Sequence, residues 1–195
     1  MSHYTSLSIL LLAAGSSTRF QANKLLTPVN GIPMYRHTLS WAQTLEPDRL
    51  AVVSQYEEIL KEAEAAGAAA VYNGHSDLGI SHSIHLALNA LEGFASDAFL
   101  FTVCDQPWLT AESVRALLDA FRKSDKGMAC LCHNGVPGNP VVFDSRYKKE
   151  LVSLTGDTGG KRILKAHPED VLWVETPHNM ELKDIDYPED LPCDL

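Results

Sequence analysis

The sequence contains few cysteines and lacks any long apolar run. Neither a C-x-x-C pair nor a zinc-type spacing occurs among the four cysteines, which are Cys104, Cys130, Cys132 and Cys193. We therefore expect free thiols in a reducing compartment. No apolar run approaches the roughly 20 residues of a membrane-spanning helix, and the N-terminal MSHYTS has no basic segment typical of a signal peptide. These absences predict a cytoplasmic protein with no membrane partner.

Positive charge is also scarce. The chain has 16 Lys and Arg against 25 Asp and Glu, which gives a net charge of -9. Because nucleic-acid binding usually needs a basic surface, a nucleic-acid partner is disfavoured. The 195 residues, of which 45% are hydrophobic, predict a single domain over residues 1–195 with an ample core. An acidic protein that binds an anionic substrate has to gather its cations locally.

Hydrophobic patterning predicts strands that alternate with helices. Strands are expected over residues 7–12, 49–54, 68–72, 97–103, 127–132, 140–143, 171–174 and 182–185. Helices are expected over residues 34–45, 57–66, 79–91, 111–124, 145–151 and 161–167, and residues 135–139 are expected to form a loop. This alternation implies an α/β fold with three α/β/α layers, Rossmann-like, around a mainly parallel sheet. Ligands of such sheets bind beyond the carboxyl ends of the strands.

A run of small residues follows the first predicted strand: Leu12, Ala13, Ala14, Gly15, Ser16 and Ser17. Small side chains let backbone N–H groups approach a ligand, and such a turn can hold phosphate oxygens. Arg19 and Lys24 add positive charge behind the turn. The pattern is neither G-x-x-x-x-G-K-[ST] nor G-x-G-x-x-G. An ordinary strand-turn pair is the simpler alternative, but the two cations favour a polyphosphate site.

Acidic residues follow later strands. Asp105 comes directly after the strand predicted over residues 97–103, in the sequence C-D-Q-P, and Asp184 and Asp186 alternate near the end of the chain. Mg²⁺ prefers one or two carboxylates together with substrate phosphates and water, which makes Asp105 a candidate ligand. The alternatives are a turn residue before Pro107 and an acidic, solvated terminus.

Two glycine-rich stretches and one helix start are further candidates. The first stretch, residues 135–141, reads G-V-P-G-N-P-V and can place backbone donors beside a ligand. The second, residues 156–162, reads G-D-T-G-G-K-R and sets mobile backbone beside two cations at a helix start. Each is alternatively a structural glycine turn. Ser81 and Ser83 either bind a ligand or cap the helix that begins near Gly79.

Together these motifs resemble the MobA-like NTP transferases of molybdenum-cofactor biosynthesis over about residues 7–191. The matching patterns are L-A-A-G-x-S-x-R-(x4)-K, N-(x5)-G, C-D-Q-P, G-N-P-V, G-D-x-G and D-I-D-x-P-E-D. The resemblance implies a nucleotidyltransferase fold and the transfer of a nucleoside monophosphate from an NTP to a phosphorylated acceptor, with release of pyrophosphate. One departure is Gln21, which stands where the family usually has Gly.

The resemblance also implies roles for individual residues. It implies catalytic roles for Arg19, Lys24 and Asp105, and Mg²⁺ ligation by Asp105 and Asp186. It implies nucleotide binding by Leu12, Ala13, Ala14, Gly15, Ser16, Ser17, Arg19, Lys24, Asn73, Gly79, Ser81 and Ser83. It implies acceptor binding by Gly138, Asn139, Pro140, Asp157, Lys161 and Arg162.

Within the family, the cytidylyltransferase branch matches best, which implies CTP as the NTP and a molybdopterin-type acceptor. Ala14 stands where the guanylyl branch usually has Gly, and its methyl group would crowd a larger base. The Leu-Pro-Trp stretch of some cytidylyl enzymes is absent, because residues 26–29 are L-T-P-V. A guanylyltransferase and a sugar-phosphate nucleotidyltransferase remain alternatives. So does a non-catalytic protein that delivers cofactor to a molybdenum hydroxylase, although a carrier has no need of paired metal-binding aspartates.

Overall fold

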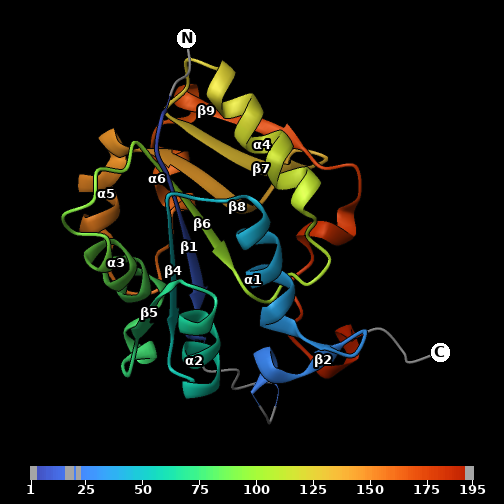
Figure 1. Cartoon of the computed structure of the whole chain (residues 1–195). Coiled ribbons are helices and arrows are strands. Elements are labelled where there is room, and N and C mark those ends of the chain that lie inside the picture. Colours follow the sequence, from blue (N-terminus) through green and yellow to red (C-terminus); the bar gives the residue numbers. More distant parts are fainter. Residues whose placement is uncertain (1–3, 16–19, 21–22, 192–195) are drawn as a thin grey trace.

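The computed structural model describes residues 4–15, 20 and 23–191. Within them, seven strands form one sheet in the order β5-β4-β1-β6-β8-β7-β9 (Figure 1). The strands are β1 (Leu7–Ala13), β4 (Arg49–Ser54), β5 (Ala69–Tyr72), β6 (Ala98–Val103), β7 (Met128–His133), β8 (Val136–Asp144) and β9 (Val171–Glu175). Only β8 pairs antiparallel, with β6 and β7 on either side of it. The predicted mainly parallel sheet is confirmed.

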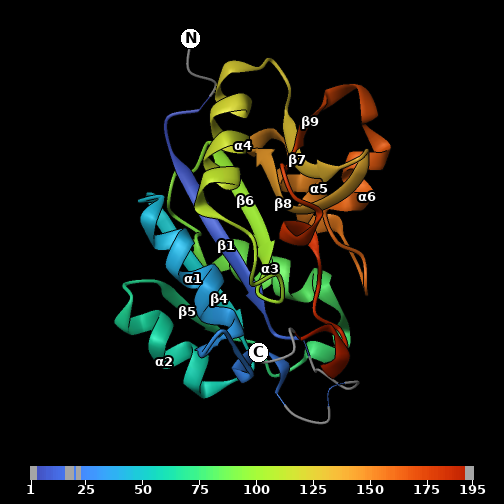
Figure 2. The same ribbon diagram turned by 90° about the vertical axis from the view of Figure 1, so that its right-hand side faces the viewer.

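Helices cover both faces of this sheet, as the alternating pattern predicts (Figure 1, Figure 2). One face packs against α1 (Met34–Thr44), α2 (Glu57–Ala65) and α4 (Ala111–Lys123), and the other against α3 (Ile80–Ala90), α5 (Lys148–Ser153) and α6 (Lys161–Ala166). Because successive side chains of a strand point to opposite faces, β1 sends Ile9 and Leu11 into the first layer and Leu10 into the second. The three-layer α/β/α fold is therefore confirmed.

Smaller elements surround the sheet. Asn23 caps the 3-10 helix η1 (Lys24–Leu26), which precedes a two-stranded hairpin of β2 (Pro28–Val29) and β3 (Ile32–Pro33). The Asn30-Gly31 turn of that hairpin has both residues at positive φ, as a tight primed turn requires. No helix in the described part of the chain is both long and apolar enough to cross a membrane.

Two predicted segments are wrong. Residues 136–139 are not loop but the start of β8, and they pair with β7 after a tight turn at Asn134 and Gly135. Pro137 and Gly138 make this stretch look like a turn in the sequence, because proline and glycine are typical of turns. Residues 182–185 do not form a strand: the 3-10 helix η5 (Asn179–Leu182) ends there, and the following residues have no ladder partner.

The glycine before α3 and the glycine turn before α6 touch each other. Gly79 has a φ of +86°, and a Cβ on it would lie 2.5 Å from the backbone carbonyl of Gly156. That same carbonyl oxygen accepts hydrogen bonds from Ser81 N at 3.2 Å and Ser81 Oγ at 2.7 Å. Two glycine segments that lie far apart in sequence are thus locked together at one edge of the sheet.

We expect Gly79→Ala to lower the free energy of unfolding by about 3 kcal/mol, because it adds both a strained left-handed backbone and a steric clash. Gly93→Ala is the matched control, since Gly93 has a φ of +89° with no neighbouring atom within 4 Å of its Cβ position. It should cost about 1 kcal/mol. Urea denaturation measures both, and equal losses would contradict the importance of the contact with Gly156.

Candidate functional site

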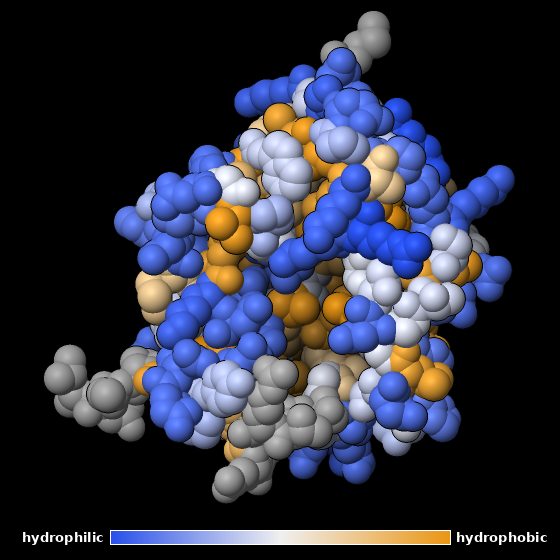
Figure 3. Space-filling model, turned by 180° about the vertical axis from the view of Figure 1, so that it is seen from behind, coloured by the Kyte–Doolittle hydropathy of each residue, from blue (hydrophilic) through white to orange (hydrophobic). Residues whose placement is uncertain are grey.

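A cavity of about 330 Å³ lies beyond the carboxyl ends of β1 and β6. Seven residues predicted to bind nucleotide or metal line it: Leu12, Ala14, Gly15, Lys24, Gly79, Ser83 and Asp105. This placement follows from topology, because ligands of parallel sheets sit at the carboxyl ends of the strands. Figure 3 shows one side of the molecule hollowed, with hydrophobic residues inside the hollow and hydrophilic ones around it.

A second cavity, of about 290 Å³, adjoins the first and shares Leu12, Ile80, Val103 and Asp157 with it. Three residues predicted to bind the acceptor line it: Asn139, Asp157 and Lys161. The rest of its wall is largely apolar and includes Ile84, Phe101, Val141 and Phe143. The structure therefore brings the two predicted groups of residues to two connected cavities.

Several predicted residues lie outside both cavities. Ala13, Asn73 and Ser81 are buried, and Asn73 donates through Nδ2 to Ser83 Oγ at 3.0 Å. Gly138 and Pro140 are buried in β8 and Arg162 is exposed on α6, and none of these three appears among the residues that line either cavity. Ser81 bonds to Gly156 rather than capping α3. Ser16, Ser17, Arg19 and Gln21 lie outside the described residues.

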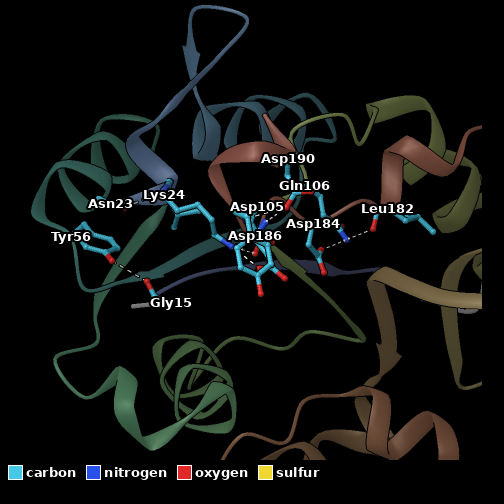
Figure 4. A network of polar contacts seen from close by, with 12 residues as sticks. Gly15, Asn23, Lys24, Tyr56, Asp105, Gln106, Leu182, Asp184, Asp186 and Asp190 are labelled. Atoms are coloured by element: carbon cyan, nitrogen blue, oxygen red, sulfur yellow. Dashed lines mark hydrogen bonds and ion pairs between the residues drawn. The ribbon is translucent and has the colours of Figure 1, made fainter. Parts of the chain in front are cut away.

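Lys24 lies between two carboxylates (Figure 4). Its Nζ is 2.9 Å from Asp105 Oδ2, at the end of β6, and 3.3 Å from Asp186 Oδ1, near the end of the chain. Burial by itself lowers the pKa of Lys24, but the two carboxylates outweigh burial and the pKa is raised. The lysine is therefore charged at neutral pH, and the two aspartates predicted as metal ligands do meet in space.

The chemistry of this pair suits a hard divalent cation. Asp105 Oδ1 is buried and has no hydrogen-bond partner among the described residues, although leaving such an atom unpaired is costly. Carboxylate oxygens completed by phosphate and water are the usual ligands of Mg²⁺. The described residues contain no cluster of three or more His, Cys, Asp or Glu able to hold a metal. Asp105 and Asp186 thus fit a metal that takes its other ligands from a substrate.

Gln106 ties the segment that carries Asp186 to the end of β6. Its Nε2 donates to Leu182 O at 3.0 Å and to Asp184 Oδ1 at 2.8 Å, while Ile185 N donates to Asp105 O at 3.0 Å. Burial raises the pKa of Asp184, and the charges of Asp105 and Asp186 raise it further. Sequence reasoning assigned Gln106 no role, although it is part of the C-D-Q-P motif.

Asp190 fixes the other side of the same segment. Its Oδ2 accepts hydrogen bonds from Asp186 N at 3.1 Å and Tyr187 N at 3.0 Å, and its Oδ1 is 3.1 Å from Lys183 Nζ. This arrangement is a capping box at the 3-10 helix η6 (Pro188–Asp190). The last acidic residue of the D-I-D-x-P-E-D motif therefore orients the backbone of Asp186, a role that sequence reasoning missed.

Comparison with known proteins identifies the family of this site. The family model described as a MobA-like NTP transferase domain matches residues 9–171. The purine catabolism protein PucB of Bacillus subtilis is 28% identical over 191 residues, which cover 93% of this chain and 92% of PucB. The bifunctional protein GlmU of Novosphingobium aromaticivorans is 33% identical over 125 residues, which cover 63% of this chain. The chain spans only 28% of the length of that GlmU.

Solved structures agree with this assignment. A crystal structure of the Mycobacterium tuberculosis rv0371c homolog from Mycobacterium sp. strain JC1 superposes with a TM-score of 0.82 at 26% identity, and covers 94% of this chain and 92% of that one. The family model spans well over half of the chain and includes residues 13–17, which we call the small-residue loop, together with Lys24 and Asp105. The chain belongs to the MobA-like NTP transferase family of nucleotidyltransferases.

Proposed function

We propose that this protein transfers CMP from CTP to the phosphate of a molybdopterin-type acceptor and releases pyrophosphate, with Mg²⁺ as its metal. The observation that carries the proposal is that Lys24 and Asp105 line the first cavity and that the Lys24 ammonium forms ion pairs with both Asp105 and Asp186. An ammonium and two carboxylates at one point provide both a phosphate contact and a metal site.

The chain's own residues position and neutralise the reactants. In the proposal, the backbone at Ala14 and Gly15 faces the triphosphate, and Lys24 and Arg19 supply positive charge to it. Asp105 and Asp186 would hold Mg²⁺, which neutralises charge on the phosphates. An acceptor phosphate oxygen forms a bond to the α-phosphorus while the bond from that phosphorus to the bridging oxygen breaks, and pyrophosphate leaves. No protein base is needed, because the acceptor phosphate is already ionised.

The apolar second cavity favours a ring-bearing acceptor over a sugar phosphate. Burial of unpaired sugar hydroxyl groups against Phe101, Val141 and Phe143 would be costly, whereas a flat heterocycle packs well on aromatic and aliphatic side chains. Asn139 and Asp157 offer a few polar contacts to ring atoms, and Lys161 offers a cation to the acceptor phosphate. These features support a molybdopterin-type acceptor, with a molybdenum hydroxylase as the proposed recipient of the product.

The choice of nucleotide rests on Ala14. Ala14 belongs to the wall of the first cavity and is 4% exposed. A methyl group at this position takes space that a glycine would leave to a purine, so the proposal favours cytosine. A guanylyltransferase is the nearest alternative, a sugar-phosphate nucleotidyltransferase the next, and a non-catalytic carrier the alternative of another class.

We expect wild-type protein to release pyrophosphate from CTP, rather than GTP or ATP, with Mg²⁺ and a molybdopterin-type acceptor. Asp105→Asn should lower kcat/KM by about 100-fold or more, because a neutral amide ligates Mg²⁺ poorly. Asp125→Asn, the same change at an exposed site away from the cavities, should keep full activity. Release from GTP would move the protein to the guanylyl branch. Cofactor binding without pyrophosphate release from any NTP would favour the carrier.

The acceptor cavity can be tested separately from the nucleotide cavity. Lys161→Gln removes a cation from the second cavity alone, so we expect the KM for acceptor to rise about tenfold while the KM for CTP stays unchanged. Lys165→Gln, an exposed lysine on the same helix, is the matched control. Steady-state kinetics with each substrate varied in turn decides this, and a rise confined to the KM for CTP would contradict the assignment.

A further inference from the structure

Three consecutive side chains hold three consecutive carbonyl groups of the small-residue loop. Ser54, Gln55 and Tyr56 follow one another at the end of β4, and we call them the carbonyl clamp. Ser54 Oγ donates to Ala13 O at 3.0 Å, Gln55 Nε2 to Ala14 O at 2.8 Å, and Tyr56 Oη to Gly15 O at 2.9 Å. The bond between Tyr56 and Gly15 is visible in Figure 4.

Strand register explains why these residues can meet. Strands β1 and β4 are parallel neighbours, and Ala13 lies opposite Ser54 at their last paired position. The two chains leave the sheet together, so each residue after β4 lies near one after β1. The side chains of Ser54, Gln55 and Tyr56 become progressively longer. This increase is needed because the two backbone segments separate beyond the last paired residues of β1 and β4. Ser54 is fully buried and also accepts from Tyr56 N at 3.1 Å, while Gln55 and Tyr56 are half-buried.

Peptide geometry turns this contact into an orientation of the loop. In a planar trans peptide, the C=O of one residue and the N–H of the next point in opposite directions. With the carbonyls of Ala13 and Ala14 held toward the clamp, the N–H groups of Ala14 and Gly15 point away from it. Ala14 and Gly15 line the first cavity, and no clamp residue is among the residues that line it. On the side away from the clamp, the loop therefore presents N–H donors. Its carbonyl oxygens, which would repel phosphate, face the clamp instead.

Gln55 also connects the loop to a second segment that lines the cavity. Its Nε2 contacts Ser76 Oγ at 3.3 Å, and Ser76 belongs both to the 3-10 helix η2 (Ser76–Leu78) and to the cavity lining. One amide group thus holds the carbonyl of Ala14 and the hydroxyl of Ser76 together, and both of these residues line the first cavity.

We propose that Gln55 and Tyr56 are positioning residues that orient the small-residue loop for the triphosphate without touching the nucleotide. This inference rests on the proposed function, since the loop is taken to bind an NTP. The clamp acts on the polyphosphate end of the ligand only. Its loss should weaken binding of phosphates and leave the acceptor cavity unchanged.

The test uses the full chain and a Gln55→Ala/Tyr56→Phe double variant. Tyr72→Phe is the control, because it makes the same change at an exposed tyrosine whose hydroxyl bonds to none of the described residues. With Mg²⁺ present, calorimetry should show affinities for CTP and for tripolyphosphate that are lower by roughly tenfold in the double variant. The KM for CTP should rise by the same factor, while kcat, the KM for acceptor and the thermal midpoint stay close to wild type.

The outcomes separate this inference from the proposed function. Equal affinities of wild type and double variant for CTP and tripolyphosphate would overturn the clamp and leave the transferase intact. A fall in kcat and thermal midpoint with an unchanged KM for CTP would also overturn it, since that pattern indicates a structural role. If the wild-type protein turns over no NTP but the double variant still binds tripolyphosphate more weakly, the clamp would be supported and the proposed reaction would be contradicted. Wild type that binds neither ligand would overturn both.

Discussion

The ammonium of Lys24 bridges two carboxylates that would otherwise repel each other beyond the end of β6. Asp105 and Asp186 lie 81 and 162 residues from Lys24 in the sequence, yet both are within 3.3 Å of its Nζ. Three chain segments must therefore be in place before the site exists. The lysine side chain is only 12% exposed, so solvent screens its attraction to the better buried carboxylate, Asp105, only in part. The surrounding structure has to keep these two carboxylates within contact distance of the Lys24 ammonium.

Different interactions hold Lys24, Asp105 and Asp186 in position. Asp105 follows β6, which is held in the sheet by a parallel pairing with β1 and an antiparallel pairing with β8. Lys24 begins a short 3-10 helix that is capped by Asn23. Asp186 belongs to no sheet, and the side chains of Gln106 and Asp190 hold its segment instead. The site therefore combines a rigid sheet edge with a segment whose position depends on a few polar contacts.

Much of the fold follows from the sequence, because its signals are local. The apolar run at residues 7–12 predicts a buried strand, and the pattern at residues 111–124 predicts a helix, and the structure contains both as β1 and α4. The strand at residues 136–139 is not predictable in the same way, because Pro137 and Gly138 resemble a turn. Residues 182–185 form no strand, and the sequence cannot predict this, because the two apolar residues Leu182 and Ile185 carry no information on whether a neighbouring strand is present.

The site was predictable only where its residues stand in motifs. Asp105 and Asp186 are predictable because they stand in the C-D-Q-P and D-I-D-x-P-E-D motifs, and the structure brings both to Lys24. Two further contacts, Gln55 with Ala14 and Tyr56 with Gly15, each join residues that are 41 positions apart in the sequence. Local composition and spacing do not indicate such contacts. The same holds for the contact of Gly79 with Gly156, where the need for glycine comes from a backbone that is remote in sequence. Residues that support a site through other residues therefore escape sequence reasoning more readily than those expected to touch the ligand.

The most direct test of the central claim is anomalous diffraction from crystals of the protein grown with CTP and Mn²⁺ as a substitute for Mg²⁺. We predict an anomalous peak coordinated by carboxylate oxygens of both Asp105 and Asp186, with Lys24 Nζ displaced from between them and in contact with a phosphate oxygen of CTP. A peak bound away from this pair, or Lys24 still bridging the two carboxylates with nucleotide present, would contradict the account.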